Sequence, residues 1–304
     1  MEIKHKINES LKYILILSFL IILHTHFGEI IFYNICKNLF PNFINKQKKE
    51  VCICTLGKEE NKYIKDFVEH YKGLGVDKIF IYDNNEKNGE KFDDVLFEQC
   101  YNKYKKEYDW FIFFDIDEFI HLSNYTNIKM FLNEKKFDKC KLIYFNCVRH
   151  TDNDLLYYDN RTLEERFPII NWNSSLYTLK SIIRGNNTNH IKFTTTHWLD
   201  RKLKKGCNVF GKYVHPTWKV QLGNSINHPK HKIYYIDHYC FKSTEEYINK
   251  INKGDGEFGF KKSIKMHKIK LYFEYNRITL EKINYIENKT GLNLEKYKLM
   301  LKKE

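Results

Sequence analysis

The run Trp110-Phe-Ile-Phe-Phe-Asp-Ile-Asp117 passes from five consecutive apolar residues directly to a pair of carboxylates. An uninterrupted apolar run is typical of a central strand in a parallel sheet, because helices cover both of its faces. In extended backbone, residues i and i+2 point to the same side, so Asp115 and Asp117 are expected to project together. The run therefore predicts a buried strand over 110–114 with an acidic edge, which also includes Glu118 as a neighbour of the two aspartates.

Two strand–helix units are predicted upstream of this run. Apolar runs indicate strands over 51–55 and 78–82, and apolar residues at helical spacing indicate helices over 60–74 and 92–106. A chain that alternates strand and helix in this way forms right-handed βαβ units. The predicted fold class is therefore α/β, with a Rossmann-like, mostly parallel sheet flanked by helices.

Polar side chains gather where these three strands end. Ligands of doubly wound sheets bind at the carboxyl ends of the strands. The residues at those ends are Thr55 with Glu59, Asp83 with Asn84, and Asp115 with Asp117. Their coincidence predicts a ligand site at this edge of the sheet.

The rest of the chain gives a coarser pattern. Strands are predicted over 141–145, 178–184, 190–195 and 232–237, and helices over 126–136, 244–253, 278–288 and 293–302. The last two helices are expected to form a polar hairpin.

Two carboxylates on one side of the backbone can bind one hard divalent cation, with water and substrate phosphate completing its shell. Such a cation stabilises the charge that grows on a departing nucleoside diphosphate. A helix N-cap or a surface loop is the alternative for Asp115 and Asp117. A second such pair, Asp152-Asn-Asp154, lies in a turn-like polar stretch. The position after so apolar a strand favours the first pair.

Several segments, taken together, resemble glycosyltransferase family 92 and the related family 2-like enzymes. The segments that carry the resemblance are Glu69–Asn84, Trp110–Phe119, Asp152–Phe167, Lys180-Ser-Ile-Ile-Arg184 with the later His197, and His238-Tyr-Cys-Phe-Lys-Ser243 followed by Glu246 and Lys250. They cover about residues 50–255 in the expected order, which is far more specific than any single motif. The chain departs from the family pattern at Asn84-Asn-Glu86 and over 200–230, so the acceptor side is the least defined.

The resemblance implies a GT-A fold, a UDP-sugar donor, and Mn²⁺ or Mg²⁺. By this analogy Thr55, Glu59 and Asp83, with the adjoining Asn84, line the nucleotide-sugar pocket. His238 supplies a third metal ligand beside Asp115 and Asp117.

Four further residues are candidates for the chemistry. Lys180 and Arg184 are expected to meet phosphate, or to be two solvated residues on one strand face. Lys242 is a candidate phosphate contact, with a surface position as the alternative. An inverting transferase needs a carboxylate that deprotonates the acceptor hydroxyl. Asp152 is the first choice for this base.

Other acidic residues near these candidates have alternative interpretations. Asp154 and Glu165 are the other choices for the base, and simple turn chemistry is the alternative for all three aspartate and glutamate positions. Glu165 with Arg166 is expected to form a structural ion pair, and Asp237 is expected to be structural.

The N-terminus carries the strongest apolar stretch of the chain. We expect a tail over 1–12, a signal-anchor helix over 13–33, a stem over 34–48, a GT-A domain over 49–265 and a helical C-terminal extension over 266–304. A cleaved signal peptide and a buried amphipathic helix are the alternatives for the apolar stretch. The expected localisation is a single-pass type II membrane protein of the secretory pathway, in the Golgi or ER of a eukaryote.

Composition narrows the function classes. The net charge is +13, but the lysines are spread along the whole chain and no nucleic-acid-binding motif is present, so no nucleic-acid partner is expected. None of the eight cysteines forms a Cys-X-X-Cys pair, which argues against structural zinc. Cys52 and Cys54, on one face of a predicted strand, are expected to be buried free thiols. Disulfides are permitted in an oxidising compartment.

The predicted function is transfer of a sugar from a UDP-sugar to a glycan or glycoprotein acceptor by a metal-dependent enzyme. Direct in-line attack predicts inversion at the anomeric carbon. A nucleotidyltransferase of related fold is one alternative, because it also places carboxylates at strand ends. An inactive, membrane-tethered carbohydrate-binding protein is the other.

Overall fold

The computed structural model describes residues 50–57, 60–83, 92–172, 178–185, 193–195, 198–199, 206–214, 232–252 and 262–303. Residues Glu50–Glu304 form one compact unit. The predicted tail, signal anchor and stem lie outside the described residues, as do Glu59 and Asn84. Within the described ranges, no helix combines the length and the apolar character needed to cross a membrane.

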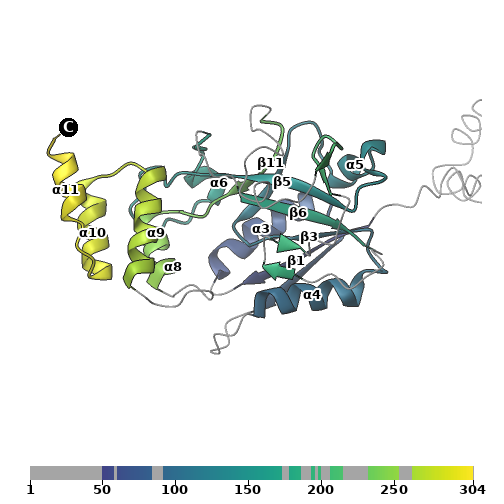
Figure 1. Cartoon of the computed structure of the whole chain (residues 1–304), viewed down its shortest axis with the longest axis horizontal. Coiled ribbons are helices and arrows are strands. Elements are labelled where there is room, and N and C mark those ends of the chain that lie inside the picture. Colours follow the sequence, from purple (N-terminus) through teal and green to yellow (C-terminus); the bar gives the residue numbers. More distant parts are fainter. Residues whose placement is uncertain are drawn as a thin grey trace, which may run out of the picture. The chain divides into compact units, whose positions relative to one another are not determined.

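A nine-stranded mixed sheet forms the centre of the unit (Figure 1). Its strands are β1 (Val51–Gly57), β2 (Lys78–Asp83), β3 (Trp110–Phe113), β4 (Glu118–Leu122), β5 (Leu142–Arg149), β6 (Thr178–Arg184), β9 (Gly206–Asn208), β10 (Tyr213–Val214) and β11 (Tyr234–His238). The order is β10-β9-β5-β6-β3-β1-β2, and β11 pairs with both β5 and β4. The short strands β7 (Phe193–Thr195) and β8 (Trp198–Leu199) form a separate pair.

Six of the nine strands run in one direction, and β4, β6 and β10 run against them. The prediction of an α/β fold with a mostly parallel sheet is confirmed at this level. The antiparallel β6 between β3 and β5 was not predicted, because strand propensity does not indicate which neighbour a strand will choose.

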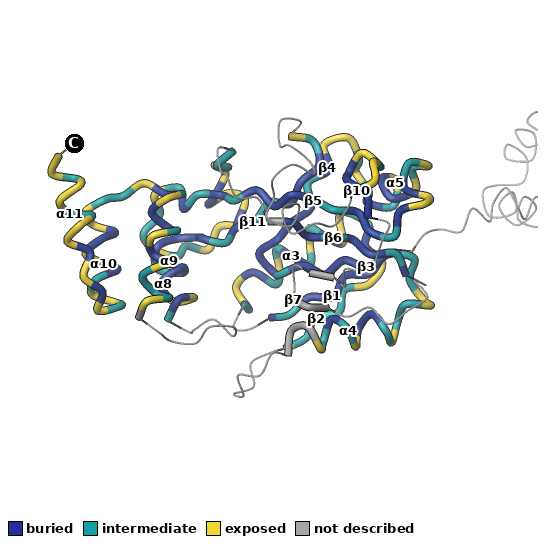
Figure 2. The backbone as a smooth tube through the Cα atoms, viewed as in Figure 1, coloured by how far each residue is buried: buried dark blue, intermediate teal, exposed yellow. Residues whose placement is uncertain are grey.

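The first two βαβ units explain the layers. Along β1 and β3, alternate residues enter two separate cores, one containing Ile53 and Ile112 and the other containing Phe111 and Phe113. Helix α3 (Asn61–Gly73) packs its buried residues into the first core, and α4 (Phe92–Tyr104) packs into the second. The central strands are therefore buried on both faces, as Figure 2 shows.

Helices α8 (Thr244–Asn252), α9 (Lys262–Tyr275), α10 (Leu280–Thr290) and α11 (Glu295–Leu301) lie together at one end of the sheet (Figure 1). They share a hydrophobic core that includes Ile248, Tyr272 and Ile283. Helices α8, α10 and α11 match the predicted ranges closely. Helix α9 was not predicted, because its apolar residues are distributed around the helix and do not form one clear apolar stripe.

Three shorter helical segments complete the described unit. They are α5 (Ile128–Leu132), the 3-10 helix η1 (Lys135–Phe137) and α6 (Leu163–Arg166). The single helix predicted over 126–136 is therefore divided in two. Asn127 caps α5 by accepting a hydrogen bond from the N–H of Lys129, which gives this short helix a defined start.

Two disulfides join elements of the sheet layer. Cys54 of β1 is bonded to Cys100 of α4, and Cys140 is bonded to Cys207 of β9. The expectation that Cys54 is a free thiol was wrong, because α4 brings Cys100 beneath the same face of β1. Cys52 is buried and not disulfide-bonded, as expected.

Removing the Cys140–Cys207 bond should lower stability substantially. The bond closes a segment with a sequence separation of 67 residues. Releasing a loop of this size is expected to cost roughly 4 kcal/mol in the free energy of unfolding. Urea unfolding of the double variant Cys140→Ala/Cys207→Ala measures the cost. Cys52→Ala is the matched control and should lose only about 1 kcal/mol; equal losses would contradict the assigned bond.

Candidate active site

The acidic edge predicted after the apolar run is a tight turn between β3 and β4. The Asp115 N–H donates to Glu118 Oε2 at 3.1 Å, and the Glu118 N–H donates to the Asp115 carbonyl at 3.1 Å. The exposed fractions of the three carboxylate side chains are 38% for Asp115, 5% for Asp117 and 0% for Glu118. The turn therefore presents Asp115 at the surface and draws the other two carboxylates inward.

Lys180 lies beneath this turn. It extends from β6, which pairs with β3, and its side chain is 1% exposed. Its Nζ lies 2.9 Å from Asp115 Oδ2 and 3.0 Å from Glu118 Oε2. Burial by itself would lower the pKa of Lys180. The nearby Asp115 and Glu118 carboxylates have the larger effect and raise the pKa above its ordinary value. Lys180 therefore holds the turn together as a buried cation.

Glu118 has an unusual environment for a carboxylate. Complete burial raises its pKa to about 8, and the nearby Lys180 ammonium offsets this only in part. Its Oε1 atom is buried and makes no hydrogen bond to any described residue. The sequence predicted Glu118 as an edge residue, and only the pairing of β4 with β11 shows that it faces the interior.

Asp117 receives three cationic or polar groups from the C-terminal side. Lys242 Nζ lies 3.0 Å and Lys250 Nζ lies 3.2 Å from Asp117 Oδ2, and His238 Nε2 lies 3.6 Å from Oδ1. Burial would raise the pKa of Asp117, but the two ammonium groups outweigh it and hold the pKa well below the ordinary value. Asp117 is consequently a buried, permanently charged carboxylate.

His238 is placed beside Asp117 by strand register. β11 runs antiparallel to β4 with His238 opposite Glu118, and the next residue, Tyr239, donates its N–H to the Asp117 carbonyl at 3.0 Å. Burial lowers the pKa of His238 to about 3, so the imidazole is neutral, and its Nδ1 makes no hydrogen bond to any described residue. A neutral imidazole is the form that binds metal ions.

The chemistry of these donors fits a hard divalent cation. Neighbouring ligands about 2.1 Å from a small octahedral ion lie roughly 3 Å apart. The 3.6 Å between Asp117 Oδ1 and His238 Nε2 is only slightly wider. Across the described ranges, no three His, Cys, Asp or Glu side chains already converge as a metal site. Asp115 instead contacts Lys180, so its participation would require that side chain to turn.

The predicted nucleotide side adjoins this turn. Thr55 of β1 is fully buried, and its Oγ1 makes no hydrogen bond to any described residue. A Cβ added at Gly57 would lie 3.0 Å from the side chain of Ile116, so the end of β1 approaches the acidic turn closely. Asp83 is exposed at the end of β2, opposite Gly57 in the register. These strand ends therefore meet at one edge, as predicted.

Arg184 does not reach this edge. It lies opposite Trp110, at the start of β3, whereas the acidic turn follows the end of that strand. Its guanidinium donates to the carbonyls of Phe137 and Cys140 and lies 4.2 Å from the Trp110 ring. Four strand residues span about 13 Å. Arg184 and Lys180 are therefore about this far apart along β6, and only Lys180 lies at the acidic turn.

Asp152 lies in a buried polar cluster with the C-terminal helices. Its Oδ2 accepts a hydrogen bond from the Tyr272 hydroxyl and lies 2.7 Å from Lys282 Nζ, while Oδ1 accepts from the Asp154 N–H at 3.0 Å. The Asp152 N–H donates to Asn276 Oδ1 at 2.6 Å. Both carboxylate oxygens are engaged, and this arrangement fits an anchoring role better than the general-base role expected from the sequence.

Asp152→Asn is therefore expected to lower the free energy of unfolding by about 2 kcal/mol. The loss is moderate because Lys282 keeps Asp154 as a partner at 2.9 Å. Urea unfolding and UDP-release kinetics on the same preparation separate the two roles. A normal unfolding curve with a large fall in kcat alone would instead identify Asp152 as the base.

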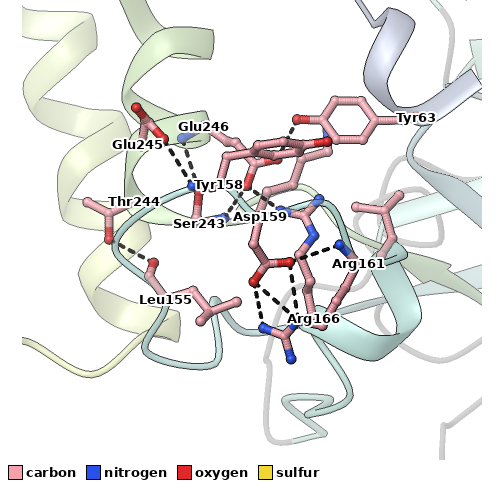
Figure 3. A network of polar contacts seen from close by, with 12 residues as sticks. Tyr63, Leu155, Tyr158, Asp159, Arg161, Arg166, Ser243, Thr244, Glu245 and Glu246 are labelled. Atoms are coloured by element: carbon pink, nitrogen blue, oxygen red, sulfur yellow. Dashed lines mark hydrogen bonds and ion pairs between the residues drawn. The ribbon is translucent and has the colours of Figure 1, made fainter.

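A polar network fixes the segment that carries Lys242 (Figure 3). Glu246 of α8 accepts hydrogen bonds from Arg166 at 2.7 Å, from the Tyr63 hydroxyl at 2.5 Å, and from both the N–H and the hydroxyl of Ser243. Lys242, directly before Ser243, has a φ of +55° in the left-handed region and lies 4.2 Å over the Tyr63 ring. The network holds this unfavourable backbone conformation in place.

The expected Glu165–Arg166 ion pair was wrong. Glu165 completes a capping box with Thr162 at the start of α6, and Arg166 is 1% exposed and paired with Glu246. Side chains of adjacent helical residues point in different directions. Asp237, expected to be structural, lies 2.7 Å from His150 Nε2.

Two contributors to the site were not singled out from the sequence. Lys250 belongs to one of the segments that resemble the family, and Glu246 and Lys250 are four residues apart and so share one face of α8. Tyr63 fits the apolar spacing of the helix predicted over 60–74, and its hydroxyl contact to Glu246 joins segments separated by 183 residues. The helical spacing could have revealed Lys250, whereas Tyr63 had no local signal.

Comparisons with known proteins identify the family of the chain. The family model of glycosyltransferase family 92 matches residues 47–96 and 90–251, which together form more than half of the chain. A glycosyltransferase family 92 protein of Ricinus communis is 25% identical over 111 residues, covering 29% of this chain and 20% of the relative. One of Arabidopsis thaliana is 27% identical over 102 residues, covering 26% and 18%.

A third relative, from Oryza sativa subsp. japonica, is 24% identical over 98 residues, covering 25% of this chain and 17% of the relative. The matches therefore span about a fifth of the length of these curated relatives. The match to the family model includes the acidic turn, Lys180, His238, Lys242 and Lys250. The resemblance inferred from the sequence motifs is confirmed, and the chain belongs to glycosyltransferase family 92.

Proposed function

We propose that the chain is a metal-dependent glycosyltransferase of the GT-A type, which moves a sugar from a UDP-sugar to a glycan or glycoprotein acceptor. The observation that carries this proposal is the buried, charged Asp117 in a turn at the carboxyl edge of the sheet. Neutral His238 adjoins one of its oxygens, and Lys242 and Lys250 adjoin the other. Family membership supports sugar transfer as the reaction class.

The residues divide into a metal side and a phosphate side. Asp115, Asp117 and His238 would hold Mn²⁺ or Mg²⁺, and the bound ion would neutralise charge on the departing diphosphate. Lys242 places a second positive charge beside the same position, because its Nζ is fixed by Asp117 and the Tyr63 ring. Lys180 keeps Asp115 and Glu118 in place from below. Thr55 and Asp83 border the nucleoside side, with Glu59 and Asn84 expected there from the sequence.

Direct attack of an acceptor hydroxyl inverts the anomeric carbon, and the proton must pass to a base. Asp152 was the expected base, and its contacts with Lys282 and Tyr272 assign it to an anchoring role in this proposal. NMR of the first-formed product determines the anomeric configuration directly.

The proposed location is the secretory pathway, with residues 13–33 as a signal anchor. The two disulfides support this location, because such bonds persist mainly in oxidising compartments.

A UDP-release screen over common UDP-sugars, with Mn²⁺ and with EDTA, tests the proposed reaction. The expected result is Mn²⁺-dependent release of UDP from at least one donor. Pyrophosphate release from UTP and a sugar 1-phosphate, with no UDP release from any UDP-sugar, would identify a nucleotidyltransferase instead. Sugar binding in calorimetry without any UDP affinity would identify an inactive carbohydrate-binding protein.

A further inference from the structure

Asp117 is contacted by two lysines whose surroundings differ. Lys242 Nζ and Lys250 Nζ lie 3.0 Å and 3.2 Å from the same oxygen, Oδ2. The Lys242 side chain is 4% exposed, whereas the Lys250 side chain is 50% exposed. One carboxylate oxygen thus contacts a lysine with a buried side chain and a lysine with a half-exposed side chain.

Lys242 is held in place by several groups. Its left-handed backbone is fixed by the adjacent Ser243, whose N–H and hydroxyl both donate to Glu246. Its ammonium lies over the Tyr63 ring and 3.8 Å from Glu60. Withdrawing the Lys242 ammonium from Asp117 would also disturb its contacts with the Tyr63 ring and Glu60.

Lys250 has far fewer constraints. It lies on α8 near its C-terminal end, and Asp117 is its ion-pair partner within the described ranges. A half-exposed lysine on a flexible stem can leave a carboxylate at small cost, because water replaces the lost contact. Lys250 is therefore the cation that can move.

The charges around Asp117 explain why Lys250 would move when a divalent ion binds. The lysines at positions 180, 242 and 250 already lie beside the carboxylates of Asp115 and Asp117. A divalent ion on Asp117 would meet two ammonium groups already at that carboxylate, and like charges at such distances repel. A diphosphate beside the ion supplies the negative charge that a displaced ammonium needs.

We propose that Lys250 is a phosphate-binding residue that exchanges Asp117 for the diphosphate of the donor, which makes nucleoside diphosphate and divalent ion bind cooperatively. The inference rests on the proposed function and adds a residue and a coupling to it. Cooperativity is reciprocal: the nucleotide tightens ion binding by the same factor by which the ion tightens nucleotide binding.

The test is calorimetry on the full chain, using UDP and Mn²⁺ separately and then each in the presence of the other. Lys250→Met removes the ammonium and keeps the length of the stem. Lys296→Met is the matched control, because Lys296 is an exposed lysine on α11. Thermal unfolding checks that each variant is folded.

In wild type, UDP is expected to tighten Mn²⁺ binding by about 10-fold or more. Lys250→Met is expected to weaken UDP binding by about 10-fold, to leave Mn²⁺ alone bound equally or more tightly, and to reduce the coupling. Lys296→Met should match wild type. If Lys250→Met keeps wild-type UDP affinity and coupling, the exchange is wrong while the proposed function stands. If wild type binds no UDP with or without Mn²⁺, both fail.

Discussion

Asp117→Asn is expected to lower the rate of sugar transfer by about 10³-fold, the largest effect on activity of any single substitution at the site. The change removes the negative charge that orders Lys242, Lys250 and His238 around one position. It also removes a proposed metal ligand. The UDP-release assay, run with a donor identified by the screen, measures the loss.

The second Asp-X-Asp sequence of the chain offers the matched control. Asp154 is 50% exposed and contacts Lys282, at a different position from the acidic turn. Asp154→Asn should retain activity within about threefold of wild type, because surface substitutions away from a site have small effects. Because Asp117 is buried, Asp115→Asn gives a second test at a more exposed position, with an expected loss of at least about 10²-fold. Activity in Asp117→Asn above a tenth of wild type would contradict the assigned role.

The largest expected effect of a single substitution on stability belongs to Arg166. Its side chain is 1% exposed and lies 2.7 Å from Glu246, whose side chain is 5% exposed. Removing one partner of a buried ion pair leaves the other charge uncompensated, at a cost of about 3–5 kcal/mol. Arg166→Leu should therefore lower the free energy of unfolding, measured by urea denaturation, by about 3–5 kcal/mol. Turnover should fall as well, because Glu246 also fixes Ser243 beside Lys242.

Figure 3 contains the control for this prediction. Arg161 also pairs with a carboxylate, Asp159 at 2.6 Å, but the two side chains are 53% and 36% exposed. Exposed ion pairs contribute about 0–1 kcal/mol to stability. The free energy of unfolding of Arg161→Leu should therefore be close to that of wild type. The double variant Arg166→Leu/Glu246→Leu should recover part of the single-variant loss. Similar losses in Arg161→Leu and Arg166→Leu would show that burial does not decide the value of these pairs.

The sequence was most informative where local patterns coincide with the fold. The apolar run ending at Asp115 gave a strand and an acidic edge, because five apolar residues followed by carboxylates suit a buried strand and its exposed end. Helix α3 and strand β2 were predicted within one or two residues, because α3 has apolar residues at helical spacing and β2 is a short apolar run that ends at turn residues. These elements depend on neighbours close in the sequence.

The parts that were not predicted depend on distant contacts. Strand β4 was not predicted, since its place beside β11 joins Glu118 to His238 across 120 residues. Arg184 lies away from the predicted phosphate site because β6 runs antiparallel to β3, which places Arg184 opposite the start of β3. The sequence does not show this register. Asp152 carries no local sign of its contact with Lys282, which lies in a C-terminal helix. Charge partners of this kind follow from topology and not from spacing.

The central claim is that the acidic turn, which contains Asp117, binds a nucleoside diphosphate together with a divalent ion. Calorimetric titration of UDP into the full chain, in Mn²⁺ and in EDTA, for wild type and Asp117→Asn, tests it most directly. The account predicts that wild type binds UDP at least about 10-fold more tightly in Mn²⁺ than in EDTA, and that Asp117→Asn loses this difference. Equal UDP affinity for both proteins in Mn²⁺ would contradict it.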